Sequence, residues 1–407
     1  MEVLYPRCAG LDVHAAQVTA CVRLAAGADV TRHQRMFPAT VTGLLALGTW
    51  LHEHGCTHVA MEATGVYWKP VWHLLEAEFE LVLANPMHIK QVPGRKSDVT
   101  DAVWIADLLA HGLIRPSFVP PTAVQELRDL TRTRKQLMAE LARHTLRIQK
   151  TLEDANVKLT RVVSDLLGRS SRAILRALIA GETDPARLVE VTRGRLKATP
   201  AQLLEALQGH VTAHHRFMIQ MHLTQIEHLE AAVHALDARL GEALPPFQQA
   251  VALLTTMPGL GETAARVLVA EIGIDMSRFP TAGHLVSWAG LCPRLHESAG
   301  KRRSTRIRPG APWLKTTLVQ AAWAATRAKG TYLQAQFLRL KGRRGPKKAI
   351  VAVAASMLTA AYFMLRNGAE YQDLGGRYLD NRDKARLTAR LVRRLEGLGL
   401  TVDVRAA

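Results

Sequence analysis

Two long amphipathic segments constrain the fold of this chain most strongly. Residues 124–155 and 219–244 carry apolar side chains at spacings of three and four, with polar and basic side chains on the remaining faces. This period is that of an α-helix with one apolar stripe, and two such helices bury their stripes by pairing. We therefore predict a helical coiled-coil region over residues 121–246, whose second helix ends at the Pro-Pro pair 245–246. The same stripes favour self-association, so a homo-oligomer (a dimer or a tetramer) is expected.

The first 120 residues have a different pattern, in which short strands are interspersed with helices. Strand composition is found at residues 10–14, 17–25, 35–37, 57–63 and 80–86. Helical patterns separate and follow the later strands. Three early strands followed by alternating helices and strands predict a mixed α/β sheet domain over residues 1–120.

After residue 246 the composition is helical again. An apolar run at 349–365 is shorter than the ~20 residues that a membrane-spanning helix needs, and it contains Ser356 and Thr359. We therefore expect a buried core helix there and no membrane partner. The sequence predicts a mainly α-helical domain over 247–370, followed by a charged tail at 371–407.

Charge and cysteine content restrict the class of partner and the compartment. The chain has 53 Lys and Arg residues against 35 Asp and Glu, a formal net charge of +18, which favours a polyanionic partner such as nucleic acid. Its four cysteines include no Cys-x-x-Cys pair, and its N-terminal residues lack the pattern of a signal peptide. A cytoplasmic location is expected.

Four carboxylates in the first domain are candidates for a metal site. Asp12 lies inside an apolar strand segment and Glu62 ends another, while Asp98 and Asp101 lie three residues apart at the start of a predicted helix. Buried carboxylates are costly unless they are solvated, paired or bound to a metal. Together they would form an oxygen-rich pocket suited to Mg²⁺, and two such ions about 4 Å apart support phosphodiester chemistry. The alternative is that Asp98 caps the helix and Asp101 occupies its first turn.

A glycine-rich turn at 257–261 is a candidate phosphate site. Gly259 and Gly261 allow close approach of the backbone, and N–H groups at the start of the following helix can hold a phosphate. A plain turn between helices is the alternative.

The segment 296–308 combines hydroxyl groups with a cluster of cations. Ser298 and Ser304 are accompanied by Lys301, Arg302, Arg303, Arg306 and Arg308. These cations could grip a scissile phosphate and stabilise charge that develops on it, which would activate a serine nucleophile. The alternative is a solvated basic surface with turn-forming serines.

The motifs together resemble a known family. GLDVH, MEATGVYW and KSDVTDA, in this order, resemble the DEDD motif of the insertion-sequence transposases called the one-ten family, and MPGLGETAARVLVAEIG with the later C-terminal blocks is similar to the eleven-eleven subgroup. The resemblance implies a RuvC-like (ribonuclease-H) fold for the N-terminal domain. It also implies that Asp12, Glu62, Asp98 and Asp101 are its catalytic, Mg²⁺-binding residues. Ser298 matches the family's catalytic serine, with Ser304 as the second choice.

The resemblance further implies a mechanism and partners. Ser298 would attack a DNA phosphodiester beside the acidic residues, and a non-coding guide RNA would pair with element-junction and target DNA. One rival is a metal-dependent Holliday-junction nuclease that does not use Ser298. A second rival is a non-catalytic nucleic-acid-binding protein.

Overall fold

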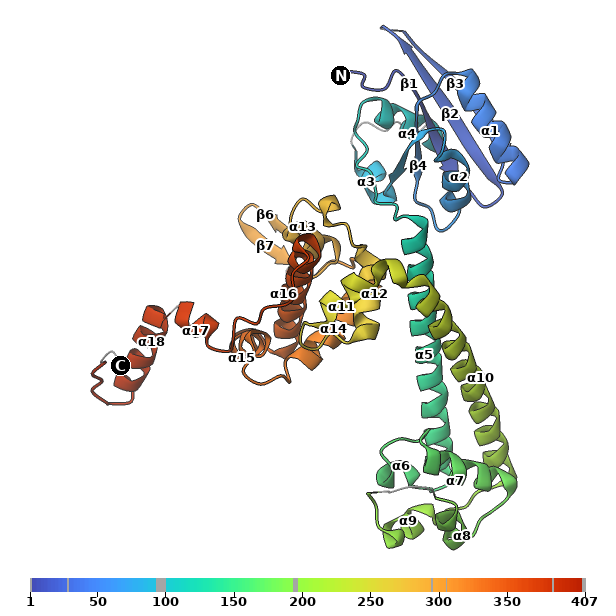
Figure 1. Ribbon diagram of the computed structural model, residues 1–407. Helices are drawn as coiled ribbons and strands as arrows, with labels where there is room; N and C mark the ends of the chain where they lie inside the picture. The colour runs from blue at the N-terminus through green and yellow to red at the C-terminus, as the bar shows by residue number, and fades with distance from the viewer. Residues whose placement is uncertain are drawn as a thin grey trace. The chain divides into compact units, whose positions relative to one another are not determined.

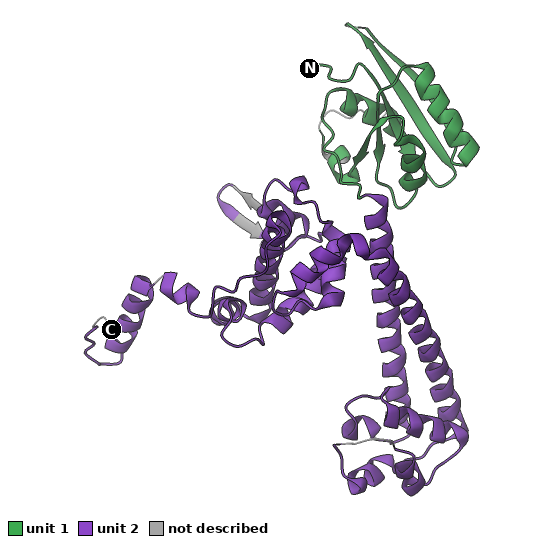
Figure 2. Ribbon diagram, viewed as in Figure 1, with its two compact units in different colours: residues 1–120 green, residues 121–407 purple. Residues whose placement is uncertain are grey.

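The computed structural model describes residues 2–27, 29–92, 100–192, 197–293, 296–304, 306–382 and 384–404. The chain forms two compact units, Met1–Pro120 and Pro121–Ala407 (Figure 2). The predicted division into four regions remains a prediction.

The first unit is built on a mixed five-stranded sheet with the order β3-β2-β1-β4-β5. Its strands are β1 (Arg7–Val13), β2 (Gln17–Ala26), β3 (Asp29–Pro38), β4 (His58–Glu62) and β5 (Glu80–Ala84). The first three pair antiparallel, and β4 and β5 continue the sheet parallel to β1. The predicted mixed α/β sheet is confirmed.

Helices cover both faces of this sheet. They are α1 (Val41–Glu53), α2 (Trp68–Leu75), α3 (Pro86–Gln91) and α4 (Asp101–Ala110). Alternate strand residues such as Leu11 and Met61 pack with α1 and α2, whereas Ala60 packs with Ile105 of α4 on the opposite face. The short helix α3 was not predicted; its signal is local, because Asn85 caps its N-terminus and Pro86 follows the cap.

Two long helices open the second unit. Helices α5 (Thr122–Asp154) and α10 (Ala213–Ala243) run side by side (Figure 1). The C-terminal end of α5 and the N-terminal end of α10 pack with four short helices that the sequence did not predict. These are α6 (Leu159–Val162), α7 (Arg169–Ala180), α8 (Pro185–Glu190) and α9 (Pro200–Leu207). The 3-10 turn Pro245–Phe247 follows α10, as expected from the proline pair.

The remaining helices form a separate core. They are α11 (Gln248–Thr255), α12 (Glu262–Ile272), α13 (Ala282–Trp288), α14 (Pro312–Ala325), α15 (Tyr332–Arg344) and α16 (Pro346–Asn367). Helix α16 alone, among the described residues, is long and apolar enough to cross a membrane, but half of its most apolar stretch is buried in the protein. Val353, Met357 and Ala361 lie in the core, so α16 packs as the predicted core helix.

Two further features complete the second unit. A hairpin of β6 (His296–Ser298) and β7 (Lys301–Ser304) interrupts the helical sequence. Helices α17 (Tyr378–Arg382) and α18 (Lys384–Glu396) follow the core, and none of the described residues of either helix is buried.

Candidate active site and nucleic-acid interface

Asp12 and Glu62 lie near the ends of neighbouring parallel strands. Leu11 of β1 is in register with Met61 of β4, so the next residues on the two strands are Asp12 and Glu62. Leu11 and Met61 face the core under α1 and α2. Because side chains alternate along a strand, Asp12 and Glu62 project from the opposite face, which α4 covers.

Helix α4 brings Asp101 to the same face. A Cβ atom on Gly10 would lie 2.3 Å from the carbonyl oxygen of Ala102 and 2.4 Å from the nitrogen of Ala106, so only glycine lets α4 pack this closely on β1. Asp101 is the first residue of α4 and lies one turn before Ile105, which packs near Ala60 of β4. The structure therefore places Asp12, Glu62 and Asp101 on one face of the sheet. Asp98 lies outside the described residues.

The two strand carboxylates have polar neighbours. The Asp12 carboxylate is 3.1 Å from Nε2 of His14 and its side chain is 26% exposed, while the Thr64 hydroxyl donates to Glu62 at 3.4 Å. Carboxylate oxygens are the ligands that Mg²⁺ takes in proteins, so the residue types fit this ion. Within the described ranges, however, no three His, Cys, Asp or Glu side chains are grouped closely enough to hold a metal.

Asp107, a further acidic residue of α4, has a different role. Its Oδ1 atom accepts hydrogen bonds from Arg23 of β2 at 3.0 Å and from Arg32 of β3 at 2.9 Å. Arg23 is buried. These bonds attach α4 to the antiparallel strands and help to fix the position of Asp101 at its start.

The structure places Ser298 at the end of strand β6. Ser298 pairs with Lys301 across the hairpin, and the two intervening residues, Ala299 and Gly300, have φ of 48° and 72°. Positive φ at both positions defines the tight turn that suits a two-residue hairpin. The side chains of Ser298, Arg302 and Arg303 lie outside the described part of the structure.

The other predicted contacts of this segment are exposed. Lys301, Arg306 and Arg308 are at the surface, and the Ser304 hydroxyl accepts from the backbone nitrogen of Arg306 at 3.2 Å. A basic turn at the surface is accessible to a nucleic-acid backbone.

The glycine-rich turn between α11 and α12 has a packing role that the sequence did not reveal. A Cβ on Gly259, whose φ is +82°, would lie 2.3 Å from the backbone nitrogen of Ala325 in α14. Gly261 is the N-cap of α12 and makes no side-chain cap, so the first N–H groups of α12 have no such capping bond. The phosphate-binding role of both glycines remains a prediction.

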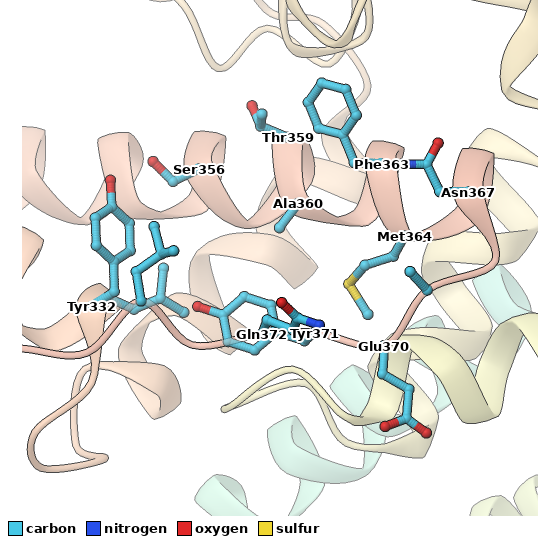
Figure 3. A pocket seen from close by; sticks show the side chains of 13 residues that line it. Tyr332, Ser356, Thr359, Ala360, Phe363, Met364, Asn367, Glu370, Tyr371 and Gln372 are labelled. Carbon is cyan, nitrogen blue, oxygen red and sulfur yellow. The ribbon is translucent and has the colours of Figure 1, made fainter. Parts of the chain in front are cut away.

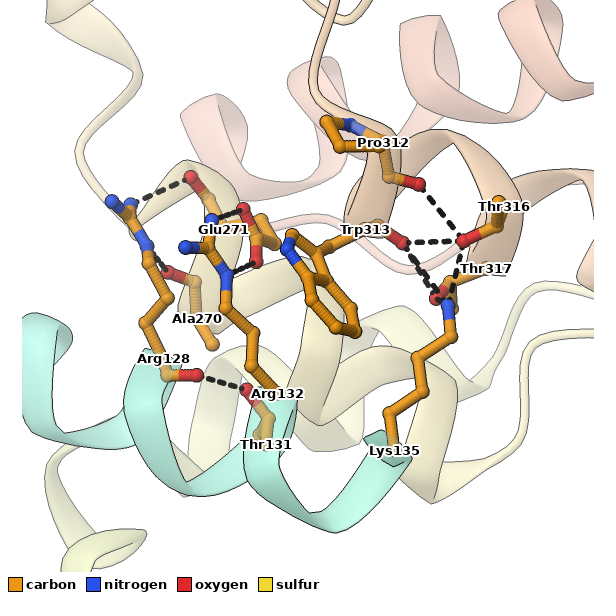
Figure 4. A network of polar contacts seen from close by, with 10 residues as sticks. All are labelled: Arg128, Thr131, Arg132, Lys135, Ala270, Glu271, Pro312, Trp313, Thr316 and Thr317. Carbon is orange, nitrogen blue, oxygen red and sulfur yellow. Dashed lines mark hydrogen bonds and ion pairs between the residues drawn. The ribbon is translucent and has the colours of Figure 1, made fainter. Parts of the chain in front are cut away.

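Several cations of α5 are used inside the protein. Arg132 forms a two-point ion pair with Glu271 at 2.7 and 2.8 Å, and Arg128 donates to the carbonyl oxygens of Ala270 and Glu271 at the end of α12 (Figure 4). Lys135 donates to oxygens of α14. This part of α5 is therefore a structural attachment to the C-terminal core rather than a free basic surface.

The α16 recess, a hollow of about 480 Å³ between α15, α16 and residues 369–374, has a different character (Figure 3). Phe363, Met364 and Tyr371 are among its lining residues, and Glu370 is the one charged side chain among them in the described structure. The absence of cations from this described lining makes it unsuitable for a polyanion.

Comparison with known proteins gives a consistent result. A family model described as a transposase matches residues 9–157, and one described as the IS116/IS110/IS902 transposase family matches residues 251–338. The chain is 30% identical over 307 residues to the uncharacterized 43.6 kDa protein of insertion element IS110 from Streptomyces coelicolor, covering 69% of this chain and 73% of the relative. It is 24% identical over 341 residues to the pilin gene-inverting protein of Moraxella bovis, covering 80% and 86%.

The sheet that carries acidic residues, the basic helical unit and these matches together define a protein of the transposase and DNA-recombinase class. The chain belongs to the IS110 family of transposases. The family predicted from the motifs is thus confirmed, while the narrower subgroup remains a prediction.

Proposed function

We propose that the protein is a Mg²⁺-dependent, site-specific DNA recombinase that excises and inserts an insertion element through a phosphoserine intermediate. The observation that carries the proposal is the placement of Asp12, Glu62 and Asp101 on the same face of the sheet, in a family of transposases. The mixed sheet supports a RuvC-like fold for residues 1–120, and the paired helices α5 and α10 support a coiled-coil region over 121–246. The C-terminal transposase domain would span 247–370, with the tail at 371–407.

The acidic residues would hold the metal. Asp12, Glu62 and Asp101, together with Asp98, would bind Mg²⁺, which supplies charge stabilisation at the reacting phosphate. His14 would orient the Asp12 carboxylate through their 3.1 Å contact.

Ser298 would carry the covalent chemistry. Its hydroxyl loses a proton and attacks phosphorus, forming a 5′-phosphoserine ester and releasing the 3′-hydroxyl of the cleaved strand. The 3′-hydroxyl of the partner strand then attacks this ester, restores a phosphodiester and returns the proton to Ser298. Lys301, Arg302, Arg303, Arg306 and Arg308 would hold the DNA backbone during both steps.

The proposal predicts a covalent protein–DNA adduct. Purified protein would be mixed with Mg²⁺, end-labelled element-junction DNA and RNA transcribed from the element's flank, and a denaturing gel would reveal a slow, protease-sensitive DNA band. We expect Ser298→Ala and Asp12→Asn to abolish the band and the matched control Ser304→Ala to retain it.

Other outcomes of this experiment identify the rivals. Nicked DNA without an adduct, unchanged by Ser298→Ala, would indicate a metal-dependent junction nuclease. DNA binding that is indifferent to Mg²⁺ and to Asp12→Asn, with no cleavage, would indicate a non-catalytic binding protein.

The proposed partners are DNA, a non-coding guide RNA and further copies of the chain, and the proposed location is the cytoplasm. The net charge of +18 supports nucleic-acid partners, and the exposed cations Arg147 and Lys150 on α5 are available to an RNA backbone. Light scattering of the protein with its RNA should give the mass of a dimer or tetramer, and a monomeric mass at micromolar concentration would contradict the oligomer.

A further inference from the structure

A second recess of the C-terminal unit, the α12 recess, has walls of two kinds. It encloses about 360 Å³ between α5, α10, α12 and α14, which lies in the lower part of the roughly 300–1,000 Å³ range of small-molecule sites. One wall is apolar and is formed by Met138, Leu240, Ala264, Val267 and Ala321. Thr263, Thr317 and Gln320 add groups that donate and accept hydrogen bonds.

Among the described residues, the charged side chains that line the recess are cations, namely Arg134, Lys135 and Arg266. Arg134 is paired with Asp237, and Arg266 with Glu262. Lys135 instead donates to uncharged oxygens, at 2.6 Å to Thr316, 3.0 Å to Thr317 and 3.4 Å to the Trp313 carbonyl (Figure 4).

One further feature favours an anion here. Thr263 and Ala264 belong to the first turn of α12, whose N-cap, Gly261, provides no capping side chain. The partial positive charge of a helix N-terminus adds to the charge of Lys135, whose hydrogen bonds go to uncharged oxygens.

We propose that the α12 recess binds a single nucleotide, with the base against the apolar wall and the phosphate beside the cations. An apolar ligand would leave the cations without an anionic partner, and inorganic phosphate would leave the apolar wall exposed to solvent. A nucleotide covers the apolar wall with its base and places its phosphate beside the cations. The Met138 thioether makes favourable contacts with aromatic rings such as a base. The bound nucleotide is either free in solution or part of a DNA strand. In the second case it would be flipped out of the base stack, as happens in enzymes that act on single bases.

The lining of this recess includes Gly259 of the glycine-rich turn, but no residue that the recombination mechanism proposed above uses. It uses neither Ser298 nor the carboxylates of the first unit. Its occupation can therefore be measured without any recombination activity, and Ser298→Ala protein should bind nucleotides as the wild-type protein does.

The test is calorimetric titration of the full-length protein with dAMP, dGMP, dCMP and TMP, and with deoxyadenosine and inorganic phosphate as partial ligands. We expect at least one nucleotide to bind ten times more tightly than either partial ligand. Ala264→Leu, which fills the recess, should weaken this binding at least tenfold. Ala360→Leu is the matched control, because Ala360 is a half-buried helical alanine that lines the α16 recess instead.

Three results would overturn the proposal. They are no nucleotide binding up to millimolar concentration, equal binding of phosphate and nucleotide, or equal weakening by the two leucine variants at unchanged melting temperature. Arg266→Gln, which should also weaken the nucleotide at least fivefold, keeps the test decisive if Ala264→Leu does not fold.

A second arm identifies the source of the nucleotide. DNA that carries 2-aminopurine brightens when that base leaves the stack. A fluorescence increase that is lost in Ala264→Leu but kept in Ala360→Leu would assign the recess to a strand nucleotide. Binding of dAMP without this increase would assign it to a free nucleotide.

Discussion

Glu271 shows how a single residue connects two parts of the second unit. Its side chain is 2% exposed and its carboxylate is held by Arg132, which extends from α5. A carboxylate buried to this extent is tolerated only because it is paired. The carbonyl oxygens of the same turn are bound by Arg128, whose pKa is lowered by burial and raised again in part by Glu271.

Removing the partner of Glu271 should therefore be costly. We expect Arg132→Ala to lower the free energy of unfolding of the C-terminal core by about 3 kcal/mol, because it leaves a buried charge uncompensated. Arg143→Ala is the matched control on the same helix, since Arg143 is 63% exposed beside Glu140 and such pairs contribute about 0–1 kcal/mol. Urea unfolding followed by the helical signal measures both. Equal effects would show that the ion pair does not stabilise this junction.

At the scale of elements, the glycine beneath α4 determines where Asp101 lies. Gly10→Ala places a Cβ within 2.4 Å of the α4 backbone, so α4 must shift, and we expect a loss of about 1–3 kcal/mol. DNA cleavage should fall at least tenfold although every acidic residue is retained. Gly241→Ala, in an α10 position with open space around it, should instead stabilise by about 0.5–1 kcal/mol. Thermal unfolding and cleavage assays test the pair, and normal cleavage by Gly10→Ala would contradict the role of α4.

The helix pair α5–α10 should weaken as the pH falls. Burial and the charges of His144 and Arg147 lower the pKa of His222, so the folded protein binds fewer protons there than the unfolded chain. The free energy of unfolding is then highest above pH 6.5, the approximate pKa of an ordinary histidine, and it decreases as the pH falls from there towards the lower pKa of His222 in the folded protein. The loss is about 1.4 kcal/mol for each tenfold difference in proton affinity between the unfolded and the folded state. Hydrogen exchange of α10 at pH 7.5 and 5.5 measures this loss.

Two variants separate His222 from other sources of pH dependence. His222→Gln should reduce the difference in protection between the two pH values, whereas His214→Gln, at an exposed position on the same helix, should not. An undiminished difference in His222→Gln would contradict the assignment.

The elements that the sequence predicted are those with a strong local signal. Strand composition identified β2 and β4, period 3.6 identified α5 and α10, and continuous apolarity identified α16. The hairpin at 296–304 was missed because its strands are short and basic, with no apolar alternation, and because Ser-Ala-Gly lacks the usual Asn-Gly signal. The placement of Asp12, Glu62 and Asp101 on one face also needed the structure, since strand register and the close packing at Gly10 are long-range properties.

At the scale of the whole molecule, the excess of positive charge is spread unevenly over buried and exposed positions. The cations in the N-terminal half of α5 bind groups of the C-terminal core. Helix α18, in contrast, carries Lys384, Arg386, Arg390, Arg393 and Arg394, and none of its described residues is buried. The core therefore does not depend on this helix. A chain that ends at Arg382 should unfold at the same temperature as the full-length protein.

The same truncation should change how binding to DNA depends on salt. Each phosphate contact contributes about 0.9 to the slope of log affinity against log salt concentration, so removal of the five cations of α18 should reduce this slope by about two to four. Fluorescence anisotropy with labelled duplex DNA between 50 and about 200 mM salt measures it. A truncated chain with an unchanged slope would show that the tail does not contact nucleic acid, and the exposed cations of the hairpin and of α5 would then account for the binding.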